Sequence, residues 1–103
     1  MISRADRKVG KRRYQELRAL VGEVIRDWDP HELIAGGAPI DEFDSEISSV
    51  TAQVSRIKSA TDAAHTISRV FSSSFEPQHF TPEACRTVGE KLFLKLQAHG
   101  VVE

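Results

Sequence analysis

The feature that most constrains the fold is a row of apolar residues with helical spacing in the middle of the chain. Its members follow one another at intervals of four, three, four and three residues: Phe43, Ile47, Val50, Val54 and Ile57. On an α-helix this spacing places the five side chains on one face, as in helices that pack together at a shallow angle. Because such a stripe must be buried against other helices, the row predicts a helical protein with a long helix that begins near Asp41.

A second apolar stripe precedes this row and predicts a helix over about residues 8–28. Its members recur at three- and four-residue spacing: Tyr14, Leu17, Leu20, Val21, Val24, Ile25 and Trp28. We expect the helix to end at Asp29, because a proline disfavours helical geometry at the residue before it. Pro30 suits the first turn of a short helical segment, "PHELI", and the two glycines of "AGGAP" then mark a loop.

Two further helices are predicted in the second half of the chain. Ser59 and Asp62 have the spacing of a capping box, and Thr81 with Pro82 suits the start of a last helix. The apolar stripe of the earlier helix consists of Ala63, Ala64, Ile67, Val70 and Phe71. The apolar side of the last helix consists of Cys85, Val88, Leu92, Phe93 and Leu96. Gly100 is expected to end it.

Together these segments predict an all-α fold, a four-helix bundle-like domain with an ordered Gly-Gly-Ala-Pro loop between the first two helices. The residues expected in its core are Trp28, Phe43, Ile47, Val50, Val54, Ile67, Phe71, Val88 and Leu92. A chain of 103 residues suits one domain. Within it, residues 1–13 are expected to form a basic N-terminal extension that is partly helical or flexible.

The sequence also bears on location. No apolar run approaches the roughly 18 residues that a transmembrane helix needs, and "MISRADRKVGKRR" lacks the apolar centre of a signal peptide. The single cysteine, Cys85, excludes an intrachain disulfide and suits a reducing compartment. We therefore predict a cytoplasmic protein without a membrane segment, either a monomer or a homodimer.

Charge is distributed unevenly along the chain, although the formal net charge is only −1. Residues 23–46 contain eight acidic residues and a single basic one, Arg26. Six of the acidic residues surround the glycine loop: Asp29, Glu32, Asp41, Glu42, Asp44 and Glu46. A metal site, catalytic carboxylates, a partner-binding surface and helix capping are the candidate explanations for this cluster.

The residue pattern argues against a metal site. A calcium-binding loop needs oxygen ligands at alternate positions, a central glycine and a terminal glutamate, whereas Phe43 lies in the middle of "DEFDSEI". His31 beside Glu32 could contribute two ligands, but a protein site needs at least three that converge. We therefore predict no bound metal ion and no cofactor.

Helix capping accounts for part of the cluster, because acidic residues offset the helix dipole and accept bonds from free N–H groups at a helix start. Asp41 is the better candidate to cap the second helix, and Asp29 to cap "PHELI". Glu42 and Glu46 are expected to point outward. The charge in excess of capping predicts an acidic surface at one end of the bundle.

No residue pattern indicates catalysis. Cys85 near a helix start could act as a nucleophile with His79 as its base, but its phase with Val88 favours a buried thiol. The serines at 72–74 lack the Gly-x-Ser-x-Gly turn of hydrolases, and the paired glycines lack the lysine of a phosphate-binding loop. We therefore predict that the protein is not an enzyme.

The N-terminal segment is the candidate for contact with nucleic acid. Its six basic residues, which could neutralise phosphates, are Arg4, Arg7, Lys8, Lys11, Arg12 and Arg13. No aromatic residue lies among them to stack on bases, and no recognition-helix motif follows. Sequence-independent contact with nucleic acid is thus an alternative function and not the leading one.

Three motifs follow one another along the chain: "WDP" at the end of the first helix, "GAPIDEFDSEI" at the start of the second, and "FTPEACRTVGEKLFLKL" in the last. Their order and spacing resemble the YugE-like family of small bacterial helical proteins. The resemblance covers about residues 14–96 and leaves out the basic N-terminal segment. It implies a helical fold and a bacterial origin, and it implies no activity, because none is assigned to that family.

Size, acidity and the lack of a catalytic pattern predict a non-catalytic protein that presents the acidic cluster to a basic protein partner. Complementary charge raises the rate and the specificity of such an association. An immunity or antitoxin protein, which shields a toxin, is one form of this prediction. The alternative is a nucleic-acid-associated accessory protein that acts through residues 4–13.

Overall fold

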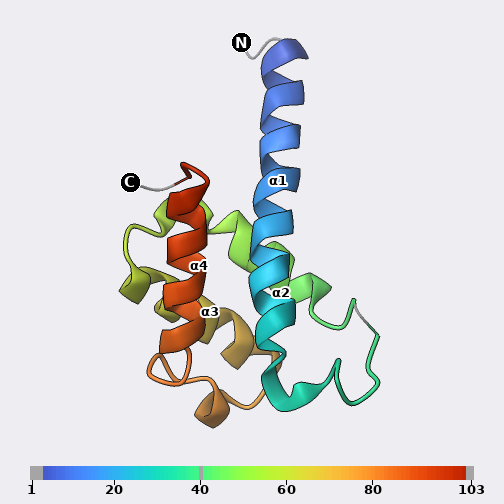
Figure 1. Ribbon diagram of the computed structural model, residues 1–103, viewed down its shortest axis with the longest axis vertical. Helices are drawn as coiled ribbons and strands as arrows, with labels where there is room; N and C mark the ends of the chain where they lie inside the picture. The colour runs from blue at the N-terminus through green and yellow to red at the C-terminus, as the bar shows by residue number, and fades with distance from the viewer. Residues whose placement is uncertain (1–3, 40, 102–103) are drawn as a thin grey trace.

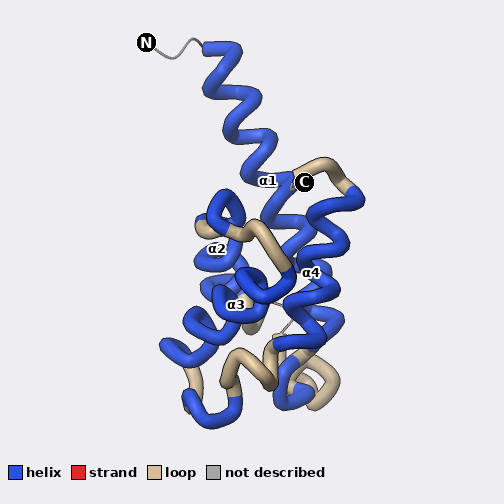
Figure 2. Tube along the Cα trace, turned by 90° about the vertical axis from the view of Figure 1, so that its left-hand side faces the viewer, coloured by secondary structure: helices blue, strands red, loops and turns tan. Residues whose placement is uncertain are grey.

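The computed structural model describes residues 4–39 and 41–101, and this part of the chain is helical throughout its regular structure (Figures 1 and 2). The α-helices are α1 (Arg4–Trp28), α2 (Asp44–Ala52), α3 (Ala60–Ser74) and α4 (Arg86–Ala98). Short 3-10 turns lie between them: η1 (Pro30–Glu32), η2 (Val54–Arg56) and η3 (Pro77–His79). The described residues contain no strand, and the predicted all-α, bundle-like fold is confirmed.

The four α-helices pack around one core. α1 lies against α2 and α4, and α3 lies against both of these helices, so each helix has two neighbours. α1 extends well past the other helices at its N-terminal end (Figure 1). Its 25 residues span about 38 Å at the usual helical rise, most of the 44 Å length of the molecule. The predicted basic extension is therefore a continuation of the first helix.

The core is built around a group of aromatic rings. Phe71 of α3 lies at its centre, with ring centroids 5.1 Å from Trp28, 5.3 Å from Phe80, 5.8 Å from Phe75 and 5.9 Å from Phe43. Eight of the nine predicted core residues are buried. Trp28, the ninth, is only partly buried and packs against the edge of this core.

The helix ends follow the predicted local chemistry. The Ser59 hydroxyl accepts a hydrogen bond from the N–H of Asp62 (3.0 Å), and the Thr81 hydroxyl accepts one from the N–H of Ala84 (3.1 Å). Gly100 has φ +70 and the N–H of Val101 reaches the carbonyl of Leu96 (2.9 Å), as in a glycine-terminated helix end. The predicted Ser59 cap and the predicted glycine stop are therefore confirmed. The predicted start of the last helix at Thr81 and Pro82 is wrong, because α4 begins at Arg86 with Cys85 as its N-cap, and Thr81 caps the turn that precedes it.

The second helix differs from its prediction in both of its ends. α2 starts at Asp44, and Phe43 is its N-cap without a side-chain cap bond, so the Asp41 carboxylate does not cap it. It stops at Ala52, and Val54 and Ile57 lie in and after the 3-10 turn η2. Both residues are nevertheless buried, because the turn still directs them into the core.

α3 and α4 approach each other closely at Gly89. A Cβ atom at this position would lie 2.7 Å from the nitrogen and 2.8 Å from the Cα of Ala64. These are backbone atoms of the opposite helix, which cannot move aside independently. The glycine therefore sets the distance between the two helices.

Candidate functional site

The acidic residues around the glycine loop have different structural roles. Asp29 holds the loop together: its carboxylate accepts hydrogen bonds from the N–H groups of Ile34 and Ala35, both at 2.9 Å. Its own backbone is left-handed, with φ 43. The carboxylate makes no cap bond to η1, so it does not cap "PHELI" as predicted but binds the end of this segment and the start of the glycine loop.

Asp44 joins α2 to α1. Its Oδ1 lies 3.2 Å from Nη2 of Arg26 and 3.6 Å from Nη2 of Arg18. Arg18 also donates to the hydroxyl of Ser48 (3.2 Å). Two cations therefore neutralise this carboxylate, and the sequence pattern could not reveal the pairing because the partners lie 18 and 26 residues away.

Glu46 is buried, and its predicted outward position is wrong. Its side chain is 7% exposed, and Oε2 has no hydrogen-bond partner among the described residues. Glu46 lies three residues after Phe43 and four before Val50. On a helix this spacing places it on the same face as these two buried residues, beside the apolar stripe. Glu46 therefore does not contribute to an acidic surface.

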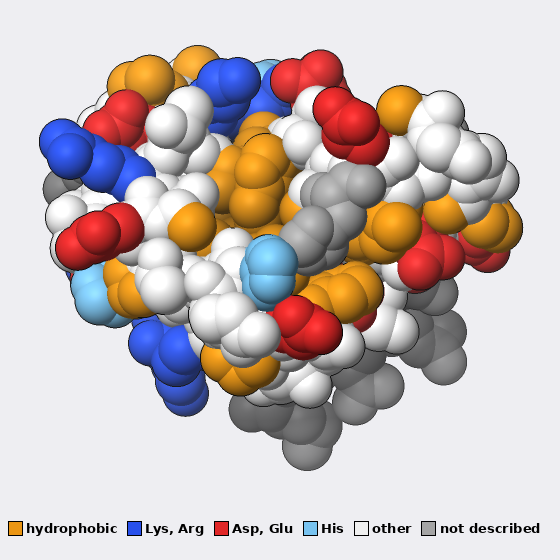
Figure 3. All heavy atoms as spheres, turned by 90° about the horizontal axis from the view of Figure 1, so that it is seen from below, with side chains coloured by type: hydrophobic (Ala, Val, Ile, Leu, Met, Phe, Trp, Pro, Cys, Tyr) orange, Lys and Arg blue, Asp and Glu red, His pale blue; other side chains and the backbone are white. Residues whose placement is uncertain are grey.

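Three members of the cluster remain exposed: Glu32, Asp41 and Glu42. None of them pairs with a cation among residues 4–39 and 41–101. All three belong to the connection between α1 and α2, at the end of the bundle that Figure 3 views. We call these three residues the acidic surface.

The connection that carries the acidic surface is stabilised by its own hydrogen bonds. The N–H of Gly36 reaches the carbonyl of Glu32 (2.8 Å), and the N–H of Ala38 reaches that of Leu33 (2.8 Å). Gly37 has φ +107, a backbone conformation that residues other than glycine rarely adopt. With the two bonds to Asp29, these contacts give the predicted Gly-Gly-Ala-Pro loop a defined shape.

The candidate nucleophile is buried. Cys85 is 0% exposed, and burial raises the pKa of its thiol to about 11. His79, the base considered for it, pairs instead with Glu76, with Nε2 and Oε2 3.2 Å apart. No group of three metal-binding side chains occurs in the part of the chain that the structure describes. The side chain of His31 lies outside that part.

The basic segment is helical as far as its backbone is described, from Arg4 onward. The side chains of Arg4, Arg7, Lys8, Lys11 and Arg12 lie outside the described residues. Arg13 is described, and it is exposed beside a cavity that also includes Lys58 and Val101. The sequence reasoning missed this cavity, because its residues come from three distant segments.

None of the described helices is both long and apolar enough to cross a membrane.

Comparisons with known proteins give a family and nothing finer. No curated protein and no solved structure matches the chain. The narrower resemblance to the YugE-like proteins, with its bacterial origin, stays a prediction. The model of one family, described as "Domain of unknown function (DUF1871)", matches residues 20–100. The chain therefore belongs to the DUF1871 family, a family of domains whose function is undefined.

Proposed function

We propose that this protein is a non-catalytic binding protein whose acidic surface receives a basic protein partner. The observation that carries the proposal is the exposure of Glu32, Asp41 and Glu42 without a neutralising cation among the described residues. Other carboxylates of the same cluster have internal roles. The charge of the acidic surface is thus available to a molecule outside the fold.

The hydrogen-bonded loop supports the same proposal. A loop that is already ordered loses little conformational entropy on binding, so more of the interaction energy contributes to affinity. Asp29 orders the loop through its bonds to Ile34 and Ala35, and the backbone bonds of residues 32–38 add to this. The acidic surface is therefore presented in a fixed arrangement.

Apolar side chains beside the acidic surface complete the argument. Leu33 and Ile34 are only partly buried, and Ala35 is exposed. Figure 3 shows hydrophobic side chains in the middle of this end of the molecule, with acidic, basic and histidine side chains around them. An apolar centre with a charged rim is the usual composition of a protein–protein interface.

An immunity or antitoxin role is the finer form of the proposal. A protein of this kind neutralises a toxin by covering its functional surface, which needs charge complementarity and no chemistry of its own. A gene for a basic toxin beside the gene for this chain would support it. In this form the protein acts in the cytoplasm, as a monomer or a homodimer.

The proposal predicts separate effects on binding and stability when the acidic surface is reversed. Glu32→Lys with Glu42→Lys should leave the free energy of unfolding within about 0.5 kcal/mol, because both side chains are exposed and form no ion pair with a described residue. The same variant should bind the partner roughly tenfold more weakly, through slower association at low salt. Pull-down from the native host, mass spectrometry and surface plasmon resonance with the identified partner would measure this.

The matched control is Glu16→Lys with Glu90→Lys, which changes the net charge equally on α1 and α4. Glu16 and Glu90 are exposed and lie outside the α1–α2 connection. We expect this control to retain wild-type affinity. Equal weakening in both variants would mean that only net charge matters, and unchanged affinity in the Glu32/Glu42 variant would refute the proposal.

Contact with nucleic acid through the basic N-terminal helix is the second candidate. The observation that favours it is the extension of α1 past the other helices, which keeps the backbone of this segment away from the rest of the fold (Figure 1). The acidic surface plays no part in this candidate.

Deletion of residues 1–12 tests it. If these residues bind phosphates, the deletion should abolish retention on heparin or duplex DNA, and wild-type affinity should fall steeply with salt because counterions are released on binding. The melting temperature should change little, because the core begins with Leu17. Retention that survives the deletion would exclude this candidate.

A further inference from the structure

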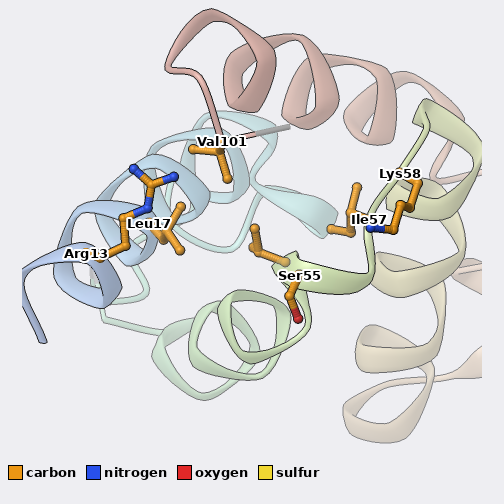
Figure 4. Close-up of a pocket in the computed structure, with 7 residues that line it drawn as sticks. Arg13, Leu17, Ser55, Ile57, Lys58 and Val101 are labelled. Atoms are coloured by element: carbon orange, nitrogen blue, oxygen red, sulfur yellow. The ribbon is translucent and has the colours of Figure 1, made fainter. Parts of the chain in front are cut away.

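A cavity of about 550 Å³ lies beside the middle of α1, away from the acidic surface. Three segments that are distant in sequence form it: α1, the stretch from η2 to the start of α3, and the residues after α4 (Figure 4). Its lining consists of Arg13, Leu17, Val54, Ser55, Ile57, Lys58 and Val101. In Figure 1 the C-terminal end of α4 lies at the opposite end of the molecule from the α1–α2 connection.

The floor of the cavity is apolar. Val54 and Ile57 are 3% and 2% exposed and belong to the core, and Leu17 and Val101 are partly buried against it. All four are aliphatic, so the floor offers an aliphatic surface without a fixed hydrogen-bond pattern. A volume of this size is within the range of binding cavities, about 300 to 1,000 Å³.

The rim is basic. Arg13 and Lys58 are exposed and lie on opposite sides of the cavity in Figure 4, with the aliphatic side chains between them. None of the seven lining residues is acidic. Neither the guanidinium of Arg13 nor the ammonium of Lys58 forms an ion pair with a described residue.

Several cations elsewhere on the described surface do have carboxylate partners. Lys95 lies 2.8 Å from Glu23, Arg86 lies 3.5 Å from Glu90, and Arg26 pairs with Asp44. Arg13 and Lys58, like Arg56, Arg69 and Lys91, are not neutralised by a carboxylate of the described residues, but only Arg13 and Lys58 line this cavity. An occupant that neutralises both must carry negative charge at two separated points.

We propose that this cavity is a docking site for an acidic segment of a partner protein, one in which an aliphatic side chain lies between two carboxylates. The aliphatic side chain packs on Leu17 and Val101, the partly exposed apolar residues of the lining, and the carboxylates reach Arg13 and Lys58. A peptide suits the site better than a small molecule does. Sites for small molecules bury most of the ligand surface, whereas Arg13, Ser55 and Lys58 at this rim are all exposed.

The proposal is independent of the acidic surface and adds a second interface of opposite charge. With both interfaces occupied, the protein would hold a basic and an acidic partner on separate surfaces. Loss of one interface leaves the other intact. The two proposals can therefore fail separately.

Selection of a random peptide library on the intact protein, followed by fluorescence anisotropy with an enriched peptide, tests the docking site. We expect enrichment of sequences in which acidic residues lie on both sides of a leucine, isoleucine or valine. Arg13→Glu with Lys58→Glu should weaken binding of the enriched peptide roughly tenfold or more. The matched control, Arg86→Glu with Lys91→Glu, changes the charge equally on α4 and should bind as the wild type does.

Changes in amide chemical shifts on peptide binding would locate the binding site. Titration with the enriched peptide should shift the signals of Ser55, Lys58 and Val101 and leave those of residues 32–42 in place. Three results would overturn the proposal: no enrichment of acidic sequences, equal binding by the Arg13/Lys58 variant, or shifts confined to another surface. Tighter binding of a single-stranded DNA oligonucleotide with the same dependence on Arg13 and Lys58 would also overturn it, in favour of a phosphate site.

Discussion

Phe71→Ala is expected to lower the free energy of unfolding by about 3 to 5 kcal/mol, the range for removal of a buried aromatic side chain. Phe71 is 0% exposed and contacts four other aromatic rings, which come from the end of α1, the residue before α2, the C-cap of α3 and the residue after η3. The truncation removes these contacts and leaves a cavity that neighbouring helices cannot fill. Urea denaturation, followed by helical circular dichroism, would measure the loss.

A protein of this size has a total stability of roughly 5 to 15 kcal/mol, so the alanine variant could be largely unfolded. Phe71→Leu keeps most of the volume and should cost less, roughly 1.5 kcal/mol or below. Leu94→Ala is the control for apolar truncation, since Leu94 is 63% exposed and its loss should be nearly neutral. A cost for Phe71→Ala close to that of Leu94→Ala would show that the aromatic core is misplaced.

Gly89→Ala is expected to lower the free energy of unfolding by roughly 1 to 3 kcal/mol, the usual cost of overpacking. The new methyl group would lie 2.7 Å and 2.8 Å from backbone atoms of Ala64, so α3 and α4 must separate. Helix propensity alone predicts the opposite change in stability, because alanine is favoured over glycine by about 0.8 to 1 kcal/mol inside a helix. Thermal and urea unfolding would both detect it.

Gly22→Ala is the matched control, because Gly22 is also a glycine inside an α-helix. Its nearest obstacle would be Nη1 of Arg26 at 2.9 Å, the far end of a long side chain that can shift slightly while it keeps its ion pair with Asp44, unlike the fixed backbone at Ala64. We therefore expect Gly22→Ala to be neutral or stabilising. If both substitutions stabilised the protein, the close contact of α3 with α4 would be refuted.

The acidic residues around the glycine loop are similar in the sequence but have different structural roles. Asp29 orders a loop, Asp44 joins two helices and Glu46 lies in the interior. Only Glu32, Asp41 and Glu42 are exposed without a cation partner among the described residues. A charge count along the sequence would therefore overestimate the acidic surface twofold, with six residues in place of three.

Much of the fold could be predicted from local patterns. The apolar stripes, the proline after Asp29, the Ser59 cap and the Gly100 stop each act within about one helical turn, and the structure confirms them. The sequence by itself therefore determined the helical class, the helix order and most of the core. The physical reason is that hydrogen bonds and side-chain spacing along one helix depend on near neighbours.

Only the tertiary structure decided which side chains meet across helices. The pairing of Asp44 with Arg18 and Arg26, the burial of Glu46, and the contact of Gly89 with Ala64 all depend on how the helices are rotated and spaced. The cavity between Arg13 and Lys58 likewise requires three distant segments to come together. Local spacing cannot supply this information, because the rotation and separation of packed helices are set by the shapes of all the side chains between them.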